Sequence, residues 1–189
     1  MMRATDLAHL MMERTLRPGD VAVDATAGNG HDTLFLAELV GPTGWVIGLD
    51  IQQAALDEAA RRTADLKQVT LLKAGHERLA EQIAALFPEA GSCPLAGVMF
   101  NLGYLPGGDK QVTTRAETTI AALDQALALL KPGGLVSLVL YPGHPEGAGE
   151  AEAVRVHAEG LPDSFTVSRY RRVNTRRPAP ELVAIERVG

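Results

Sequence analysis

The apolar positions of the chain fall into two alternating patterns, short continuous runs and longer amphipathic stretches. A continuous apolar run of about 4–8 residues between turn residues predicts a buried strand, whereas apolar residues spaced three and four apart predict a helix. The runs predict strands that start at 21 and cover 45–50, 69–73, 95–101, 135–141, 165–173 and 182–188. The spaced positions predict helices over 4–16, 31–40, 53–66, 77–87 and 148–160, and one that follows a Thr114-x-x-Glu117 capping box.

The order of these elements indicates an α/β fold. Five strands alternate with helices, which is the pattern of a parallel sheet, and the last two strands follow each other without a helix between them. We therefore predict a seven-stranded, mostly parallel sheet with a C-terminal antiparallel hairpin and an N-terminal helix. The length and the composition, 46% apolar and 22% charged, predict a single domain over residues 1–189.

Composition also limits the location and the partners. No apolar run approaches the ~18 to 20 residues of a membrane span, and the first residues lack a signal-peptide core, so we expect a cytoplasmic protein with no membrane partner. The single Cys93 cannot form an internal disulfide, which agrees with a reducing compartment. The net charge of −5 argues mildly against nucleic acid, but a cluster of arginines predicts either a local phosphate-binding patch or a solvated strand face. The cluster is Arg169, Arg171, Arg172, Arg176 and Arg177.

The most informative stretch is residues 21–37, where an apolar run breaks at glycines and resumes as a helical pattern. Gly28 and Gly30 lack the Cβ atoms that would keep the backbone away from a ligand, and such a turn leaves N–H groups unpaired, so it predicts a nucleotide cradle. A dinucleotide-binding sequence would have a third glycine where Thr33 stands, and the lysine-containing phosphate loop is absent. Neither a nicotinamide cofactor nor ATP fits this turn well.

Two acidic residues point instead to S-adenosylmethionine (SAM). Asp24 lies four positions before the first glycine, and Asp50 closes the next apolar run. In Rossmann-like SAM enzymes the first carboxylate lies near the methionine ammonium and the second accepts both ribose hydroxyls, and the spacing here suits both roles. The Lys-Pro-Gly-Gly turn at 131–134, before a hydrophobic strand, is typical of the same enzymes. The sequence therefore predicts the Rossmann-like fold of class I SAM methyltransferases.

Further residues are expected around this cofactor. Ile51 is an expected apolar lid beside the adenosine. His76 either contacts the adenine or, with Glu77, only starts a helix, and Asp32 and Thr33 either bind the cofactor or satisfy the N–H groups of a first helical turn. No metal site is expected, because no pair of histidines has ligand spacing. The predicted cofactor-binding residues are Asp24, Thr26, Gly28, Asn29, Gly30, Asp32, Thr33, Asp50, Ile51, Gln52, His76, Glu77 and Asn101.

The fourth predicted strand leads into a second informative segment, residues 101–110. Amino-methyltransferases carry Asp/Asn-Pro-Pro-Tyr here, and its Asn oxygen and the next carbonyl accept hydrogen bonds from the substrate amine. Asn101 and Tyr104 keep the end positions, but Leu-Gly replaces the prolines, so a glycine-rich turn with a structural Asn is the alternative. His144 follows the fifth strand, on the edge where such sheets bind ligands, and His9 either faces the pocket or lies at its solvent edge. We predict Asn101, Tyr104 and His144 as catalytic residues, with Tyr104 or His144 passing a proton to solvent.

Five motifs occur together over nearly the whole chain. They lie at 24–33 (Asp-Ala-Thr-Ala-Gly-Asn-Gly-His-Asp-Thr), 50–52, 76–77, 101–110 and 141–147. This set resembles the YtqB/MnmM family of bacterial SAM-dependent methyltransferases. The resemblance implies N-methylation of the 5-aminomethyl group on the wobble uridine, often 2-thiolated, of certain tRNAs, giving 5-methylaminomethyl-uridine. It further implies SAM contacts from Asn29, Asp32, Asp50, Gln52 and His76, and an amine site lined by Asn101 and Tyr104.

The implied partner is a tRNA anticodon stem-loop, whose unstacked bases proteins read by stacking and edge contacts. Tyr104 and Tyr170 are the aromatic residues expected to stack, and the arginines at 169–177 are expected to contact phosphates. Three other functions stay open: methylation of rRNA, methylation of a small-molecule or protein amine, and a non-catalytic SAM- or nucleotide-binding module. A monomer or a homodimer is expected.

Overall fold

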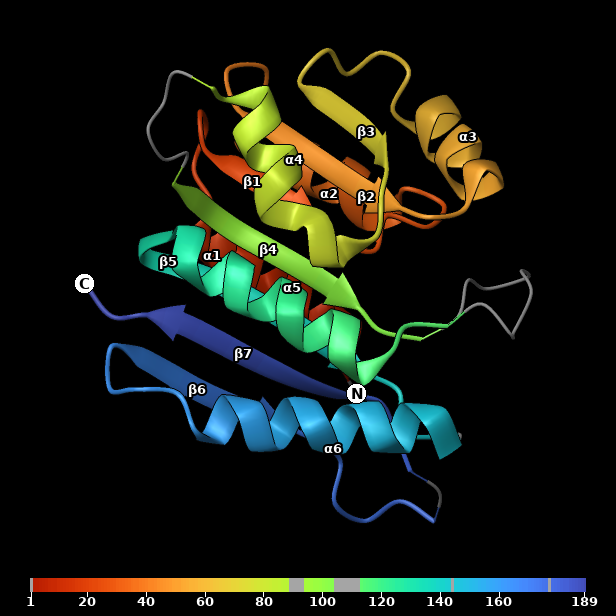
Figure 1. The fold of residues 1–189 in the computed structure, drawn as a ribbon, viewed down its shortest axis with the longest axis vertical. Coiled ribbons are helices and arrows are strands. Elements are labelled where there is room, and N and C mark those ends of the chain that lie inside the picture. The colour runs from red at the N-terminus through yellow and green to blue at the C-terminus, as the bar shows by residue number, and fades with distance from the viewer. Residues whose placement is uncertain (1, 89–93, 104–112, 144, 177) are drawn as a thin grey trace.

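The computed structural model describes residues 2–88, 94–103, 113–143, 145–176 and 178–189. Within these ranges one seven-stranded sheet has the order β3-β2-β1-β4-β5-β7-β6 (Figure 1). The strands are β1 Val21–Asp24, β2 Trp45–Asp50, β3 Val69–Lys73, β4 Leu95–Asn101, β5 Leu130–Leu140, β6 Phe165–Tyr170 and β7 Glu181–Arg187. Strands β1 to β5 pair in parallel, whereas β7 is antiparallel to both β5 and β6. The predicted sheet with its antiparallel C-terminal hairpin is confirmed.

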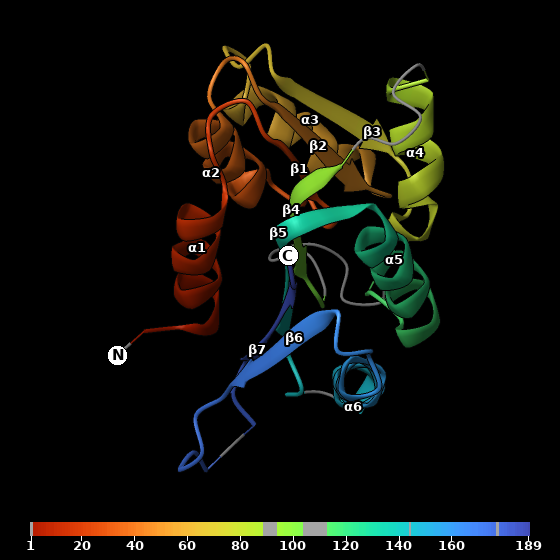
Figure 2. The ribbon, with the colours of Figure 1, turned by 90° about the vertical axis from the view of Figure 1, so that its left-hand side faces the viewer.

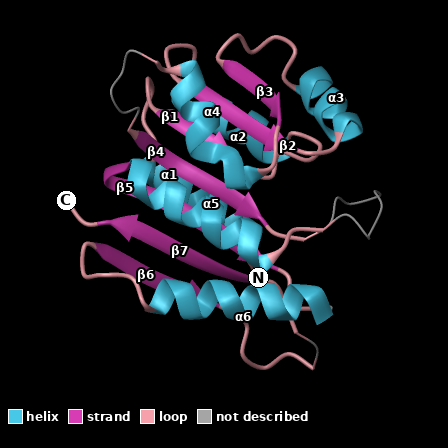
Figure 3. Cartoon of the chain, viewed as in Figure 1, coloured by secondary structure: helices cyan, strands magenta, loops and turns pink. Residues whose placement is uncertain are grey.

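Helices cover both faces of the sheet. They are α1 Ala4–Thr15, α2 His31–Val40, α3 Gln53–Arg62, α4 Leu79–Leu86, α5 Ala116–Leu129 and α6 Pro145–Glu159, with a 3-10 turn η1 at His76–Arg78. Helices α1 and α2 lie on one face, and α4, α5 and α6 lie on the other (Figure 2). Strands and helices alternate along the chain as far as α6 (Figure 3). Over the described residues, no helix combines the length and the apolarity that crossing a bilayer requires.

Strand β4 shows why continuous apolar runs form this sheet. Its side chains alternate between the two faces, so Val98 and Phe100 join the core under α4, α5 and α6, while Met99 joins the core under α1 and α2. A strand that is buried on both faces needs non-polar residues at its buried positions, as this one has from Leu95 to Phe100. At Gly97 a Cβ would lie 2.9 Å from the Met12 sulfur, so the glycine lets α1 pack closely against the strand.

Two predicted boundaries differ from the structure. The predicted turn at 131–134 lies inside β5, because Leu130 already pairs with Leu95 and the register then shifts so that Leu135 pairs with Gly97. The turn is therefore an irregularity within the strand. The helix predicted over 77–87 is divided into two elements. Its first two residues belong to η1, which has the tighter 3-10 geometry, and α4 begins at Leu79.

The predicted Thr114-x-x-Glu117 capping box is wrong. Helix α5 has Arg115 as its N-cap, with no side-chain cap hydrogen bond. The Thr114 hydroxyl instead donates to Glu150 Oε2 at 2.7 Å, and Thr119 donates to Glu150 Oε1 at 2.7 Å. A buried carboxylate on α6, far away in the sequence, therefore takes the hydroxyl that local spacing assigned to the cap.

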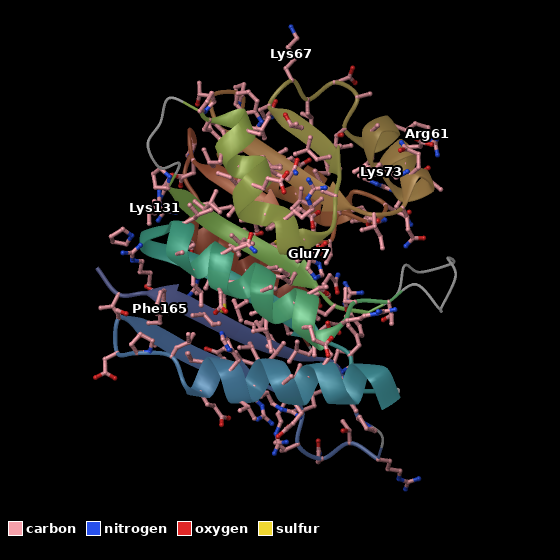
Figure 4. The ribbon with its side chains drawn as sticks, in the orientation of Figure 1. Arg61, Lys67, Lys73, Glu77, Lys131 and Phe165 are labelled. Carbon is pink, nitrogen blue, oxygen red and sulfur yellow. The ribbon has the colours of Figure 1, made fainter. Side chains whose placement is uncertain are left out.

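The strand order fixes where a ligand can bind. Strands β2 and β3 lie on one side of β1, and the chain then crosses from β3 to β4 on the other side of β1. The direction of strand addition reverses between the neighbours β1 and β4, so their carboxyl ends form a topological switch point. Asp24, Asp50 and Asn101 end the strands β1, β2 and β4 on this edge. Figure 4 shows the two edges of the parallel strands. Lys73, at the carboxyl end of β3, marks the edge on the right, and Lys131, near the amino end of β5, marks the edge on the left.

Candidate active site

A cavity of about 1080 Å³ opens at the carboxyl ends of the strands. Its walls come from the glycine turn, the ends of β2, β3 and β4, the start of α5, and Pro178 and Pro180 before β7. Most of the predicted cofactor residues line it: Thr26, Gly28, Asn29, Asp32, Asp50, Ile51, Gln52, His76, Glu77 and Asn101. Asp24, Gly30 and Thr33 do not belong to the lining. Tyr104 and His144 lie outside the described residues, so their roles stay predictions.

The glycine turn is held in place from two neighbouring elements. Gly28 adopts a positive φ of 49°, and its N–H donates to Asp50 Oδ2 at 2.9 Å. The Asn29 carbonyl accepts a hydrogen bond of 2.7 Å from Arg62 Nε on α3. A Cβ on Gly30 would lie 2.7 Å from the Cα of Ala59, so this glycine is needed for close packing against α3 rather than for direct approach of a ligand.

Asp50 presents a carboxylate to the cavity in a fixed orientation. Its Oδ1 accepts the Gln52 N–H at 2.8 Å while Oδ2 accepts the Gly28 N–H. Each carboxylate oxygen keeps a further lone pair, so the pair of oxygens can accept two vicinal hydroxyls. Ile51, 55% exposed, lies on the rim beside it. This combination fits a nucleoside whose ribose hydroxyls bind Asp50 and whose base contacts an apolar side chain.

Asp24 lies one layer beneath the turn. It is fully buried, its Oδ1 accepts the Thr26 N–H at 3.2 Å, and its Oδ2 accepts the Thr33 hydroxyl at 2.6 Å. Burial raises the pKa of the Asp24 carboxyl to about 7, and the charge of Asp32 adds to that rise. The hydroxyl of Thr33 is thus engaged inside the protein, and the predicted place of Asp24 beside a methionine ammonium stays a prediction.

His76 forms an inner wall of the cavity. Its ring meets Phe100 edge to face, with centroids 5.9 Å apart, and Nε2 lies 3.3 Å from the Thr118 hydroxyl. Burial lowers the pKa of the His76 imidazole, so the neutral ring is favoured near neutral pH. A neutral, partly apolar ring suits the edge or face of an adenine. His76 also starts η1, as one interpretation of the sequence expects, and its contact with an adenine stays a prediction.

The far end of the cavity carries a chain of polar side chains. The Asn101 N–H donates to Thr26 Oγ1 at 2.7 Å, which ties the end of β4 to the glycine turn. Asn101 Nδ2 lies 3.4 Å from Asp32 Oδ2, and Asp32 Oδ1 lies 2.7 Å from His9 Nε2. The Tyr141 hydroxyl hydrogen-bonds with the Asn101 side chain, and burial raises its pKa, with a further rise from the charge of Asp32. Polar groups from four elements therefore converge beside the cofactor residues.

Sequence reasoning missed one residue of this group and left another undecided. Tyr141 follows the fifth strand directly, and the rule that ligands bind beyond the carboxyl ends of strands would have indicated it. His9 belongs to α1, and nothing in its spacing shows that it contacts Asp32. The contact arises because α1 packs beside α2, where the His9 ring also stacks on Phe35 with centroids 3.9 Å apart.

The electrostatics of the cavity suit a cationic ligand. Asp32, Asp50 and Glu77 line it, and Asp24 lies beneath, whereas Arg115 supplies a positive charge at the start of α5. SAM joins a nucleoside to a sulfonium and an ammonium, and the cavity offers an acidic lining together with the nucleoside features described above. The residues present therefore fit SAM. Within the described ranges, no group of three His, Cys, Asp or Glu residues could hold a metal ion.

The arginine cluster begins near the end of β6, with Arg169 in the strand and the other members beyond it. Arg171, Arg172 and Arg176 are exposed, whereas Arg177 lies outside the described residues. Arg169 is engaged in an ion pair, with Nε 3.3 Å from Glu181 Oε2. A phosphate contact from Arg169 would have to compete with this ion pair.

Comparison with known proteins agrees with this geometry. Residues 46–186 match the family described as "Putative rRNA methylase". A chloroplastic tRNA (mnm(5)s(2)U34)-methyltransferase from Arabidopsis thaliana is 38% identical over 192 residues, which cover 96% of this chain and 68% of that protein. The crystal structure of a "putative rRNA-methylase" from Clostridium thermocellum has a TM-score of 0.91 at 40% identity, covering 100% of this chain and 99% of the other.

A second solved structure carries a ligand. It is a "putative methyltransferase" from Streptococcus mutans in complex with SAH, the demethylated form of SAM, with a TM-score of 0.85 at 31% identity over 100% of this chain and 99% of that one. Its ligand is the product form of the cofactor that the acidic cavity fits. The family match covers more than half of the chain, and these relatives extend over almost all of it. The chain therefore belongs to the rRNA methylase family and is a SAM-dependent methyltransferase.

Proposed function

We propose that this enzyme transfers a methyl group to the 5-aminomethyl nitrogen of a wobble uridine, often 2-thiolated, in tRNA, giving 5-methylaminomethyl-uridine. The observation that carries the proposal is the position of Asn101, Asp32 and Tyr141 at one end of the cavity whose other end holds Asp50 and the glycine turn. These side chains suit an amine, and the Arabidopsis relative is named a tRNA (mnm(5)s(2)U34)-methyltransferase.

The chemistry asks the protein mainly to position its reactants. SAM supplies an activated methyl group on its sulfonium. Asn101 and Leu102 both line the cavity. In this proposal the Asn101 side-chain oxygen and the Leu102 carbonyl accept N–H groups of the amine and thereby direct its lone pair toward the methyl carbon. An alkylammonium, with a pKa near ~10 like a lysine side chain, has no lone pair, so the site must also remove a proton. Desolvation in the cavity and a nearby sulfonium both lower that pKa.

Recognition of RNA is assigned to the surface next to the cavity. Arg171, Arg172 and Arg176 are exposed, and Tyr170 is 45% exposed at the end of β6. In this proposal the arginines contact phosphates and Tyr170 stacks on an unpaired base. Pro178 and Pro180 connect this surface to the cavity, because both line it. An anticodon stem-loop that binds the arginines could therefore insert its wobble base between these elements.

A defined-substrate assay tests the proposal. Purified protein with SAM is incubated with tRNA carrying 5-aminomethyl-2-thiouridine, with the same tRNA carrying an unmodified wobble uridine, and with rRNA transcripts. Nucleoside mass spectrometry should show one added methyl group in the first sample alone. Methylation of rRNA, or of small amines without RNA, would replace the proposal with one of the two alternative reactions. SAM binding with no turnover on any substrate would favour a non-catalytic module.

Two further expectations accompany this proposal. The cytoplasm is the proposed location, although the Arabidopsis relative is chloroplastic by its name. A monomer or a homodimer is the proposed state, and light scattering of the protein with and without the stem-loop tests it.

A further inference from the structure

Asp32 is oriented by a histidine from another element. The Asp32 side chain is 14% exposed and lines the cavity, whereas His9, 32% exposed, does not belong to the lining. His9 Nε2 lies 2.7 Å from Asp32 Oδ1, and a carboxylate can only accept, so the imidazole N–H is the donor toward the ionised carboxylate. Stacking on Phe35, with 12° between the ring planes, fixes the direction of the His9 ring. The second oxygen, Oδ2, is left facing Asn101.

The surroundings of Asp32 favour a cation at Oδ2. Among the described residues, the titratable and charged groups that face it are His9 and, beyond it, Asp6 on α1, Asp24 beneath the turn, and Tyr141 with Arg3 near its hydroxyl. The charge of Asp32 opposes the ionisation of both Asp24 and Tyr141. A cation bound between Asp32 and Asn101 would relieve this repulsion. The cation that the proposed function brings to this end of the cavity is the ammonium form of the substrate amine.

We propose that Asp32 is the proton acceptor for the substrate amine and that His9 is a positioning residue which holds Asp32 in this orientation. The inference rests on the proposed function, since it requires an alkylammonium substrate. The ammonium gives one proton to Asp32 Oδ2, leaving a neutral amine and a carboxylic acid. The nitrogen lone pair then forms the new N–C bond while the C–S bond breaks and its electron pair stays on sulfur. The carboxylic acid finally releases its proton to water at the mouth of the cavity.

Three variants separate this role from a structural one. Asp32→Asn keeps the shape and removes the base. His9→Phe keeps an aromatic ring stacked on Phe35 but removes the N–H that donates to Asp32, and His9→Gln restores an N–H donor at this position. His157→Phe is the matched control, because His157 on α6 makes the same contact with Asp124, Nε2 to Oδ1 at 2.7 Å, and neither residue lines the cavity. Thermal melts show that each variant is folded before it is assayed.

The readouts are SAH affinity by calorimetry and kcat from about pH 6.5 to 9.5 on the aminomethyl-uridine stem-loop. Asp32→Asn should lower kcat about 100-fold near neutral pH, with a rate that climbs steeply with pH as free amine forms in solution. His9→Phe should lower kcat about tenfold with a steeper pH profile than the wild type, and His9→Gln should recover part of it. SAH affinity should stay within about twofold for the His9 variants, since that ring does not line the cavity.

A binding experiment keeps the two proposals distinguishable. With SAH present, the wild type should bind the aminomethyl stem-loop more tightly than the unmodified one, and Asp32→Asn should lose that preference while His157→Phe keeps it. If the wild type methylates the amine but Asp32→Asn and His9→Phe retain its pH profile, the role of Asp32 is refuted and the proposed function stands. Parallel losses of kcat and SAH affinity in the His9 variants would make Asp32 a cofactor residue instead. A wild type that neither prefers nor methylates the amine overturns both proposals.

Discussion

The two halves of the cavity are held by different kinds of hydrogen bond. In the cofactor half, which we define as the wall from the ends of β1, β2 and η1, backbone N–H groups hold Asp50 and one oxygen of Asp24, whose other oxygen accepts the Thr33 hydroxyl. Gly28 and Gln52 donate to Asp50, and Thr26 donates to Asp24. In the substrate half, the wall from the ends of β4 and β5 together with Asp32, side chains hold side chains, and one backbone group, the Asn101 N–H, donates to the Thr26 hydroxyl. The first arrangement follows from the local path of the chain, whereas the second depends on how distant elements pack.

The substrate half is assembled from α1, α2, β4 and the residue after β5. Asn101 contacts Asp32, Asp32 contacts His9, and Tyr141 contacts Asn101. Each of these side chains has rotamer freedom that packing must remove, so a small shift of α1 changes the direction of Asp32. We expect substitutions in the cofactor half to change folding and cofactor affinity, and substitutions in the substrate half to change turnover and RNA binding.

The largest expected effect is on folding, at Gly30 in the cofactor half. Gly30→Ala combines a positive φ of 79° with a Cβ only 2.7 Å from the Ala59 Cα, so it should lower the free energy of unfolding by about 3 kcal/mol. Gly133→Ala is the matched control, because its φ is 73° but nothing lies within 4 Å of its Cβ, and it should cost about 1 kcal/mol. Urea unfolding of both variants measures the difference. Equal losses would show that α3 does not restrict the turn.

The next effect is on cofactor affinity. Asp50→Ala removes the acceptor of two backbone N–H groups and of the two expected ribose hydroxyls, so the Kd for SAH should rise about 100-fold. Asp57→Ala on α3 removes an exposed carboxylate bound only by Gln53 in the structure described, and should leave the Kd unchanged. Calorimetry measures both. An Asp50 variant that binds SAH within threefold of the wild type would contradict the assignment of the cofactor half.

The same contrast explains what the sequence could predict. Asp50 and Asn101 each end a predicted strand, and Asp24 shortly precedes the glycine turn that follows the first one. Parallel strands place their carboxyl ends on one edge whatever their side chains do. The contact between His9 and Asp32 has no such rule, since it joins residues 23 apart through the packing of two helices. The failed capping box at Thr114 has the same cause, a partner on a distant helix.

Asp24 allows a pH test of the cofactor half. Burial raises its pKa from 3.8 to about 7, so the stability it contributes is fully present below pH 3.8 and is lost as the pH rises through 7. Asp24→Asn does not ionise, and its amide can donate to the Thr33 hydroxyl while its oxygen accepts the Thr26 N–H. The variant should therefore gain about 2 kcal/mol in unfolding free energy relative to the wild type between about pH 5 and pH 7.

Urea unfolding of the ligand-free protein at the two pH values measures this gain, and Asp57→Asn controls for the loss of an exposed carboxylate. Groups that titrate in both proteins cancel in the comparison. If the difference in unfolding free energy between variant and wild type does not change with pH, Asp24 keeps its charge throughout this range. Burial would then not raise its pKa to about 7.

The smallest effect is expected on the RNA surface. Arg171 and Arg172 are exposed and solvated, so each phosphate contact is weak and screened by salt. Replacing both with Gln should lower stem-loop affinity about 3- to 10-fold at physiological salt and make the dependence of log K on log salt shallower by about 1 to 2 units. Lys67→Gln is the control, because Lys67 points away from the molecule at the far edge in Figure 4. SAH affinity should be the same in all three proteins. An unchanged salt slope would show that these arginines are only a solvated face, and the RNA surface would then have to be sought elsewhere around the cavity mouth.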